Sequence, residues 1–273
     1  MVLVSVLANL VKGSFFLTTC IVISPLVLLA HLNQHVGQLY YWIMFASVEF
    51  FYLRRQDRDL KGRLFKPLRD AHDQSKSVEA LEIGPGVGTN FAYLPPGIKL
   101  TTLEENPFFK KHFARIQKQH PTVMIQNMLI GNAENMVNVA DETFDIVIGT
   151  HIFCCIDDYR SAAKEIYRVL KPVNFCYCIY LTLTNWLDGN QGGKLYFLDI
   201  VSYPKKRWFR YAMQKLIAPF WYFVTIGCKA GNIDAEGALV DAGFDVTHMR
   251  SEVHPKGQWA ISLYYFGTAI KPE

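Results

Sequence analysis

The chain has 273 residues, of which 51% are hydrophobic, and it carries a net charge of +4 with an isoelectric point of about 8.6. This length suits one domain of catalytic size with an appendage. The basic excess is small and forms no long Lys/Arg tract, so we expect no nucleic-acid partner.

The cysteine pattern does not indicate a metal site or a disulfide framework. The six cysteines are Cys20, Cys154, Cys155, Cys176, Cys178 and Cys228. No pair has the C-x-x-C spacing of a zinc site, and no histidine cluster accompanies them. Most lie in apolar runs, where cysteine behaves as a small hydrophobic residue. We therefore expect reduced thiols, with Cys154 and Cys155 in the core, and no metal.

The N-terminal segment is apolar. Residues 13–48 contain no Asp, Glu, Lys or Arg, and two apolar runs, 14–30 and 37–53, end at Arg54 and Arg55. A run of 17 residues is near the lower limit for a helix that spans a membrane. Three interpretations compete: a secretory signal peptide, for which no clear A-x-A cleavage pattern follows, one span with a buried helix, and a helical hairpin in one leaflet. A buried hairpin of a soluble protein is the alternative without a membrane.

We expect residues 1–55 to anchor the chain to a membrane. The arginines that follow the second run predict that the large domain faces the cytosol. A charged helix is then predicted over 56–77, with Leu60 and Leu64 among the members of an apolar stripe. This linker helix is expected to lie across the mouth of a domain formed by residues 78–273.

A glycine-rich loop follows a predicted strand at 78–83. Gly84, Gly86 and Gly88 come directly after this strand, in the sequence GPGVGTN. Glycines at this position let the backbone turn sharply and leave room for a ligand against the main chain. The dinucleotide-binding pattern would have glycine or alanine at position 89, where this chain has Thr89. A nicotinamide cofactor is therefore not favoured.

Polar residues follow the next predicted strands at their carboxyl ends. Glu104 ends a strand at 98–103 and comes 20 residues after Gly84, the usual distance to a carboxylate that binds a ribose diol. Thr150 and His151 follow a strand at 145–149. Alternating strands and helices predict an α/β fold with a doubly wound, mostly parallel sheet, in which these residues share one edge.

The chain resembles the class I S-adenosylmethionine-dependent methyltransferases. The segments LEIGPGVGTN, LEEN, GNAEN, FDIV and RVLKP occur in the order and spacing of that family's motifs. The resemblance is closer to the membrane-associated alkyl-thiol methyltransferases, also called methyltransferase-like family 7. The apolar N-terminus, the PPG at 95–97, the ENP at 105–107 and the late segment IAPFWYFVTIGCKAG carry it. The resemblance implies a seven-stranded, Rossmann-like sheet.

The resemblance also implies S-adenosylmethionine as cofactor and assigns the residues that bind it. These are Glu82, Gly84, Pro85, Gly86, Gly88, Asn90, Glu104, Glu105, Asn106, Ala133, Glu134 and Thr150. The methionine part would contact Glu82, Gly84, Gly86 and Gly88. The ribose would bind to Glu104, and the adenine would lie between Ala133 and Glu134. Glu104 departs from the family pattern, which has aspartate there. His151 lies beside the reacting methyl group and is the candidate catalytic base.

The function that follows is methyl transfer to a small, hydrophobic thiol by an enzyme attached to the endoplasmic reticulum or to lipid droplets. Two alternatives remain from the sequence. One is a methyltransferase of lipid-like or quinone acceptors, which a membrane anchor would also suit. The other is a non-catalytic membrane or lipid-droplet protein, which the aspartate-to-glutamate difference at Glu104 and the interruption at 173–191 keep open.

Residues 173–191 interrupt a helix end, RVLKP, and a glycine pair that leads into the strand KLYFLDIV. These 19 residues are either a genuine insertion or a retained intron, since Val173 and Gln191 allow GT and CAG at its ends. The composition is unlike that of a surface loop. We expect the segment to loop out, so that KLYFLDIV keeps its place in the sheet.

Overall fold

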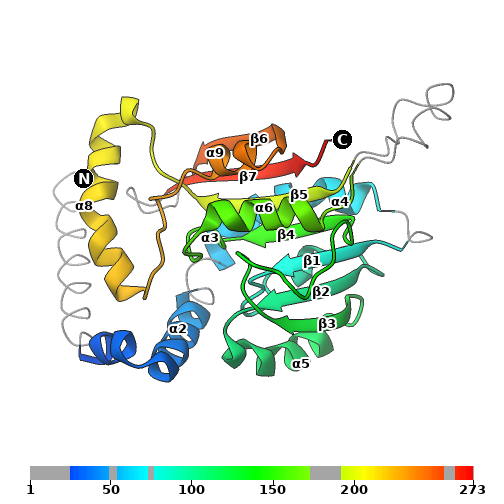
Figure 1. Cartoon of the computed structure of the whole chain (residues 1–273), viewed down its shortest axis with the longest axis horizontal. Helices are drawn as coiled ribbons and strands as arrows, with labels where there is room; N and C mark the ends of the chain where they lie inside the picture. Colours follow the sequence, from blue (N-terminus) through cyan, green and yellow to red (C-terminus); the bar gives the residue numbers. More distant parts are fainter. Residues whose placement is uncertain (1–24, 49–53, 73–76, 173–191, 255–261, 273) are drawn as a thin grey trace, which may run out of the picture.

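The computed structural model describes residues 25–48, 54–72, 77–172, 192–254 and 262–272. Its centre is a seven-stranded sheet with the order β3-β2-β1-β4-β5-β7-β6 (Figure 1). The strands are β1 (Glu79–Ile83), β2 (Lys99–Glu104), β3 (Met124–Ile130), β4 (Ile146–Thr150), β5 (Lys194–Ile200), β6 (Asp245–Val253) and β7 (Leu263–Ile270).

The sheet is mixed rather than wholly parallel. The four pairings among β1 to β5 are parallel, whereas β7 is antiparallel to both β5 and β6. The chain order reverses between β1 and β4, so their carboxyl ends flank a topological switch point, where open α/β sheets bind ligands. The predicted α/β, Rossmann-like sheet of seven strands is confirmed.

Helices cover both faces of the sheet. The α-helices are α2 (Gln34–Val48), α3 (Arg54–Leu64), α4 (Lys66–Asp70), α5 (Lys110–Gln119), α6 (Tyr159–Val169), α8 (Trp208–Val224) and α9 (Ala235–Asp241), and residues 25–32 are also helical. Helices α6 and α9 lie on one face of the sheet and α3 with α4 on the other (Figure 1). Helices α2 and α8 lie together at the end of the molecule beyond the strand tips.

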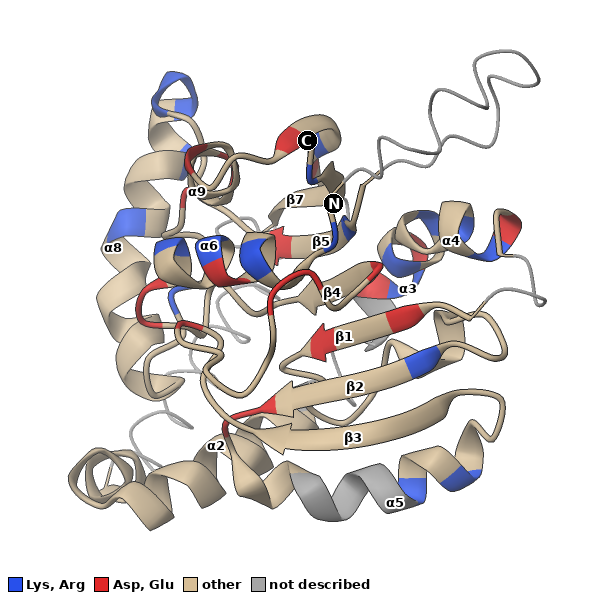
Figure 2. Cartoon of the chain, turned by 45° about the vertical axis from the view of Figure 1, so that its right-hand side comes forward, with Lys and Arg blue, Asp and Glu red and all other residues tan. Residues whose placement is uncertain are grey.

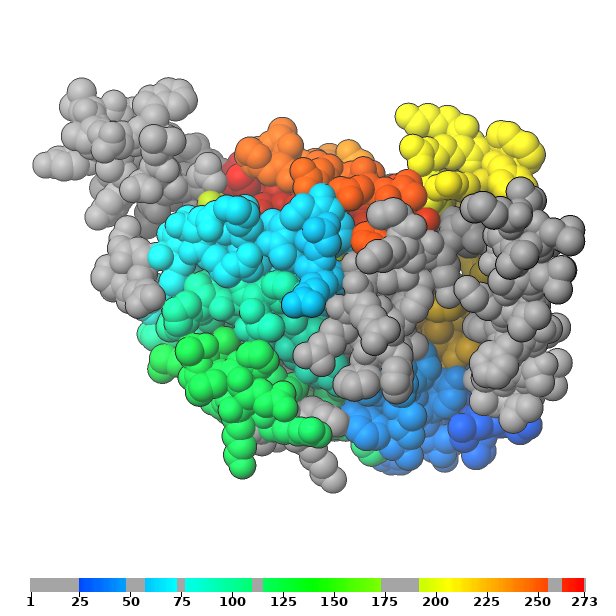
Figure 3. Space-filling model, turned by 180° about the vertical axis from the view of Figure 1, so that it is seen from behind, coloured from blue at the N-terminus to red at the C-terminus, as the bar shows by residue number. Residues whose placement is uncertain are grey.

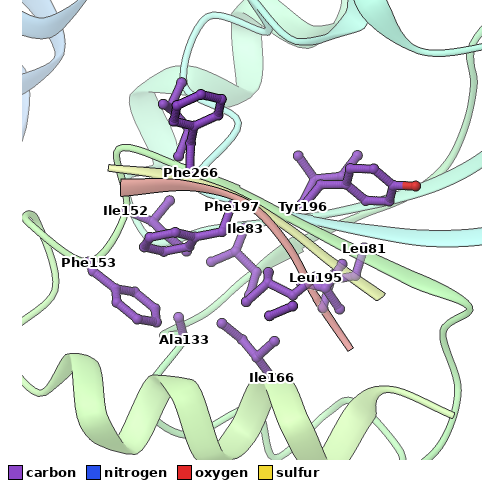
Figure 4. Packing of buried hydrophobic residues seen from close by; sticks show 14 of the residues in the cluster. Leu81, Ile83, Ala133, Ile152, Phe153, Ile166, Leu195, Tyr196, Phe197 and Phe266 are labelled. Carbon is purple, nitrogen blue, oxygen red and sulfur yellow. The ribbon is translucent and has the colours of Figure 1, made fainter. Parts of the chain in front are cut away.

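The core lies between these layers. All five residues of β4 are buried, because both faces of a central parallel strand are covered. Figure 4 shows how side chains from β1 and β5 pack with Phe153 and with Ile166 of α6. On the opposite face, Leu60 and Phe65 are fully buried in the same core. The predicted apolar stripe of the 56–77 segment therefore packs directly on the sheet.

The predicted anchor is described only in part. Residues 1–24 and 49–53 lie outside the described residues, and the helical parts are 25–32 and α2. Within the described portion of the chain, no helix has both the length and the apolar composition needed to cross a membrane.

The interruption at 173–191 also lies outside the described residues, and the structure describes the chain on either side of it. The backbone N–H of Gly193 donates to the carbonyl of Lys171 at 2.8 Å, so the two flanks already form a turn. A β-carbon at Gly193 would lie 2.8 Å from the same carbonyl oxygen, which explains the glycine. Strand β5 is Lys194–Ile200, between β4 and β7, so the predicted place of KLYFLDIV is confirmed.

Candidate active site

A cavity of about 560 Å³ opens at the carboxyl ends of β1, β2 and β4. Ten residues predicted from the sequence line it: Gly84, Pro85, Gly86, Glu104, Glu105, Asn106, Ala133, Glu134, Thr150 and His151. Three others, Glu82, Gly88 and Asn90, lie behind its wall. Figure 2 shows acidic residues near the carboxyl ends of β1 and β2, at this end of the sheet.

The glycine loop owes its shape to backbone conformations that other residues rarely adopt. Gly84, Gly86 and Gly88 have φ angles of +59°, +54° and +71°. Gly84 and Gly86 line the cavity with their backbone. Gly88 has a packing role instead, since a β-carbon there would lie 2.9 Å from the side chain of Ile116.

A buried polar network supports the loop from behind. The side-chain amide of Asn90 donates to the carboxylate of Glu82 at 2.8 Å and to the hydroxyl of Thr150 at 2.8 Å. Glu82 and Asn90 are 1% and 4% exposed. The network links the tips of β1 and β4 through the loop that follows β1. Glu82 and Asn90 therefore hold Thr150 in position in the cavity wall.

Glu104 presents a carboxylate to the cavity from the tip of β2. Its oxygens accept the backbone N–H groups of Asn106 at 3.0 Å and Gly86 at 3.3 Å. Burial raises its pKa to about 7, although these two hydrogen bonds act in the opposite direction. Near neutral pH this carboxyl group is therefore poised between its protonated and ionised forms.

The arrangement fits S-adenosylmethionine. The glycine backbone leaves room for the methionine part, and Glu104 can accept hydrogen bonds from both hydroxyls of a ribose. Ala133 and Glu134 form the neighbouring wall, after β3, where an adenine ring would lie. The individual assignments of these residues remain predictions, and the structure shows that ten of the predicted residues line one cavity.

His151 is held in an unusual conformation by its surroundings. Its φ angle of +57° is rare for a residue with a side chain, and its backbone N–H donates to the carbonyl of Leu198 at 2.7 Å. Its Nε2 atom lies 2.6 Å from a carboxylate oxygen of Asp57, which is 1% exposed. Burial lowers the pKa of His151, but the carboxylate of Asp57 outweighs burial and raises the pKa above its ordinary value.

Asp57 and Lys61 were not predicted from the sequence as site residues. Both lie on α3 and are buried, and the ammonium group of Lys61 donates to the hydroxyl of Thr89 at 2.7 Å. Positions 57, 61 and 64 share one face of the helix with Leu60. Asp57 and Lys61 place two charges on the helix face that carries Leu60 and Leu64. This pattern could have indicated site residues, because a charged side chain is rarely buried without a partner.

The opposite wall of the cavity comes from α2. Tyr41 and Phe45 line the cavity from this helix, together with Ile226 from the chain after α8. The side-chain amide of Asn106 donates to the carbonyl of Gln38 at 2.9 Å, which ties α2 to the tip of β2. Part of the segment predicted as an anchor therefore forms an apolar wall of the site.

Cys155 also lines the cavity and is only partly buried, contrary to the expectation that it is a core residue. Cys154, predicted to be in the core, is 3% exposed and buried as expected. Hydrogen bonds from Cys154 and Cys155 lower the pKa of the buried thiol of Cys228 below its ordinary value. Three thiols thus lie at one side of the cavity.

The fold and the cavity agree with comparisons to known proteins. Residues 81–178 match the family model described as "Methyltransferase domain". A solved structure from Thermotoga maritima, titled as a SAM-dependent methyltransferase and possible histamine N-methyltransferase, has the same fold. Its TM-score is 0.54 at 19% identity, with 85% of this chain and 98% of that chain covered. The chain is a class I S-adenosylmethionine-dependent methyltransferase, with S-adenosylmethionine as its cofactor.

Similar curated proteins indicate which type of methyltransferase the chain resembles. The thiol S-methyltransferase TMT1B of Rattus norvegicus is 28% identical over 249 residues, which are 90% of this chain and 93% of the relative. The thiol S-methyltransferase TMT1A of Homo sapiens is 26% identical over 84% of this chain and 86% of its own length. The chain is thus of the type of these proteins, which confirms the family resemblance seen in its motifs.

Proposed function

We propose that the enzyme transfers the methyl group of S-adenosylmethionine to a small, hydrophobic thiol. One observation in the structure supports this proposal independently of the similar proteins. The cavity joins the predicted cofactor residues to an apolar wall from α2 and to a buried His151–Asp57 pair. The apolar wall suits the carbon part of an acceptor, and the pair suits removal of a thiol proton.

The cofactor, when bound, supplies an activated methyl group on a sulfonium sulfur. The residues of this chain then have three tasks. The glycine loop and Glu104 hold the cofactor, and Tyr41 and Phe45 exclude water from the acceptor side. His151 takes the thiol proton, because a thiolate is the nucleophilic form of sulfur. Alignment of donor and acceptor in such a cavity can contribute on the order of 7–11 kcal/mol.

Asp57 acts on His151 rather than on the acceptor. A buried carboxylate that binds one ring nitrogen orients the imidazole and stabilises its protonated form. The pair contributes a proton acceptor whose pKa lies above the ordinary histidine value. A thiol with a pKa near 8–9 loses its proton more easily to such a base than to water.

We also propose that the end of the molecule formed by residues 25–32, α2 and α8 lies against a membrane. Large apolar side chains are exposed on it: Leu26, Leu28, Leu29, Leu32, Leu39, Ile43, Trp208, Phe209, Leu216, Phe220, Tyr222 and Phe223. Its helices are joined, since the ring of His31 stacks on Phe223 and Tyr40 donates to the carbonyl of Val224. Seen from behind, the 25–48 segment lies beside the end of α8 (Figure 3).

Two arguments support this placement. Exposed apolar area of this extent is typical of an interaction site. The same helix, α2, lines the cavity, so an acceptor dissolved in the bilayer could enter without crossing water. Attachment to the endoplasmic reticulum or to lipid droplets, with the catalytic domain in the cytosol, is the arrangement we propose.

The test is methyl transfer from labelled S-adenosylmethionine to a small alkyl thiol by membranes that carry the full chain. Cofactor binding is measured on the same material. Transfer to the thiol supports the proposal. Cofactor binding without transfer to any alkyl thiol would overturn the thiol assignment and favour a lipid-like or quinone acceptor. Recovery of the chain in the soluble fraction would overturn the membrane placement.

A further inference from the structure

Three cysteines from separate parts of the sequence meet beside the cavity. Cys154 and Cys155 follow β4, and Cys228 follows α8. Their three sulfur atoms all lie within 4.8 Å of one another, and those of Cys154 and Cys155 are 3.6 Å apart. Sequence spacing gave no sign of this cluster, because no pair of them has the C-x-x-C pattern.

The cluster is held by backbone contacts between the two loops. The backbone N–H of Lys229 donates to the carbonyl of Cys154. The ammonium group of Lys229 donates to the carbonyl of Asp157 at 2.9 Å, and the backbone N–H of Ala230 donates to the sulfur of Cys228. The residue after Cys228 is thus fixed to the loop after β4, which holds Cys228 beside Cys154 and Cys155.

We propose that Cys154, Cys155 and Cys228 bind one zinc ion, with the fourth position open toward the cavity. Zinc–sulfur bonds of about 2.3 Å in tetrahedral geometry place sulfur atoms roughly 3.8 Å apart. The observed separations require shifts of an ångström or less. Three thiolates form a soft ligand set, which selects zinc over magnesium or calcium. Three protein ligands with one open position are typical of catalytic rather than structural zinc.

The open position would bind the sulfur of the acceptor. Of the three cysteines only Cys155 lines the cavity, as do Thr150 and His151, so the cavity lies on that side of the cluster. An acceptor thiol bound there would form a zinc–sulfur bond and release its proton to solvent or to His151, because a coordinated thiol is deprotonated. The binding of an acceptor thiol to the zinc rests on the proposed function. The metal site itself does not.

The experiment measures metal on the full chain, purified with a reductant and stripped with a chelator. Zinc is added, the excess is removed, and bound metal is counted by elemental mass spectrometry. We expect one zinc per chain. Cys155→Ser and Cys228→Ser should each weaken zinc binding by at least about 10²-fold, because each removes a ligand and even the loss of an outer-shell partner costs about 10–100-fold. With Co²⁺ in place of zinc, the full chain should show thiolate-to-cobalt charge-transfer absorption.

The matched control is a triple variant, Cys20→Ser, Cys176→Ser and Cys178→Ser, which keeps the three clustered thiols. It should bind one zinc with unchanged affinity. Absence of zinc from the full chain, or loss of zinc in the triple variant alone, would overturn the site. If Cys228→Ser does not fold, Cys155→Ser and the cobalt spectrum of the unmodified chain decide the question. Circular dichroism and cofactor binding report folding.

A separate measurement tests whether the metal has an open coordination position. Addition of a small alkyl thiol should shift the cobalt absorption while the metal content stays constant. An unchanged spectrum would overturn the open position and leave a structural metal. Bound zinc without methyl transfer to any thiol would overturn the proposed function instead and leave the metal site standing.

Discussion

Glu104 is the residue through which pH should act on cofactor affinity. Burial raises its pKa from 4.5 to about 7, and two ribose hydroxyls require the ionised carboxylate as acceptor. We therefore expect the affinity for S-adenosylmethionine to rise about 10-fold from pH 6 to pH 8, as measured by calorimetry. The stability of the cofactor-free protein should change with pH in the opposite direction to the cofactor affinity. The free energy of unfolding falls as pH rises from about 4.5 to about 7, because the unfolded chain ionises first.

Glu104→Gln should weaken cofactor binding and remove most of this pH dependence. The matched control is Glu79→Gln, at the other end of the neighbouring strand β1, where the carboxylate pairs with Lys99. That variant should keep the pH dependence of the unmodified chain. Equal pH dependence in Glu104→Gln would show that another group is responsible.

Substitution of Asp57 is expected to lower the rate of methyl transfer and to change the affinity for the cofactor little. In Asp57→Asn the pKa of His151 falls, because the carboxylate that raises it is gone. We expect kcat to fall on the order of 10²-fold and the rise of activity with pH to move to lower pH. Steady-state kinetics over a pH range test this. The control is Asp59→Asn on the same helix, whose side chain is 72% exposed. Full activity of Asp57→Asn would remove the pair from the mechanism.

At the scale of elements, α3 should stabilise the catalytic domain rather than merely precede it. Leu60 is fully buried against the sheet, so Leu60→Ala should lower the free energy of unfolding by about 2–5 kcal/mol. Gly62 lies in the same helix, and a β-carbon there would contact nothing within 4 Å. Gly62→Ala should therefore raise stability by up to about 1 kcal/mol. Denaturant unfolding monitored by circular dichroism measures both. Equal effects of the two variants would contradict the packing of α3.

At the scale of the whole molecule, deletion of residues 173–191 should leave the domain intact. The flanks are already joined by the hydrogen bond from Gly193 to Lys171, and loop closure entropy changes slowly with length. We expect the shortened chain to keep its melting temperature within a few degrees and its cofactor affinity within about two-fold. Loss of folding on deletion would mean that the segment is part of the structure. Sequencing of the mature transcript decides separately whether the segment is a retained intron.

Local patterns predicted much of the site. The glycine spacing, the carboxylate of Glu104 and the positions of Thr150 and His151 follow from strands that end at one edge of a parallel sheet. Ten of the predicted residues accordingly line one cavity. Glu82, Gly88 and Asn90 do not reach its surface. Their hydrogen bonds and packing support the loop from behind, a distinction that depends on side-chain direction.

The sequence by itself determined the class of the protein, the strand that follows the interruption and ten of the residues that line the cavity. These depend on periodicity and motifs whose residues are close in the chain. Only the tertiary structure decided that Asp57 pairs with His151, that α2 lines the cavity and that Cys228 joins Cys154 and Cys155. Asp57 and His151 are 94 residues apart in the chain, and Gln38 of α2 and Asn106 are 68 apart. No local pattern encodes such pairings, because they depend on how helices dock on the finished sheet.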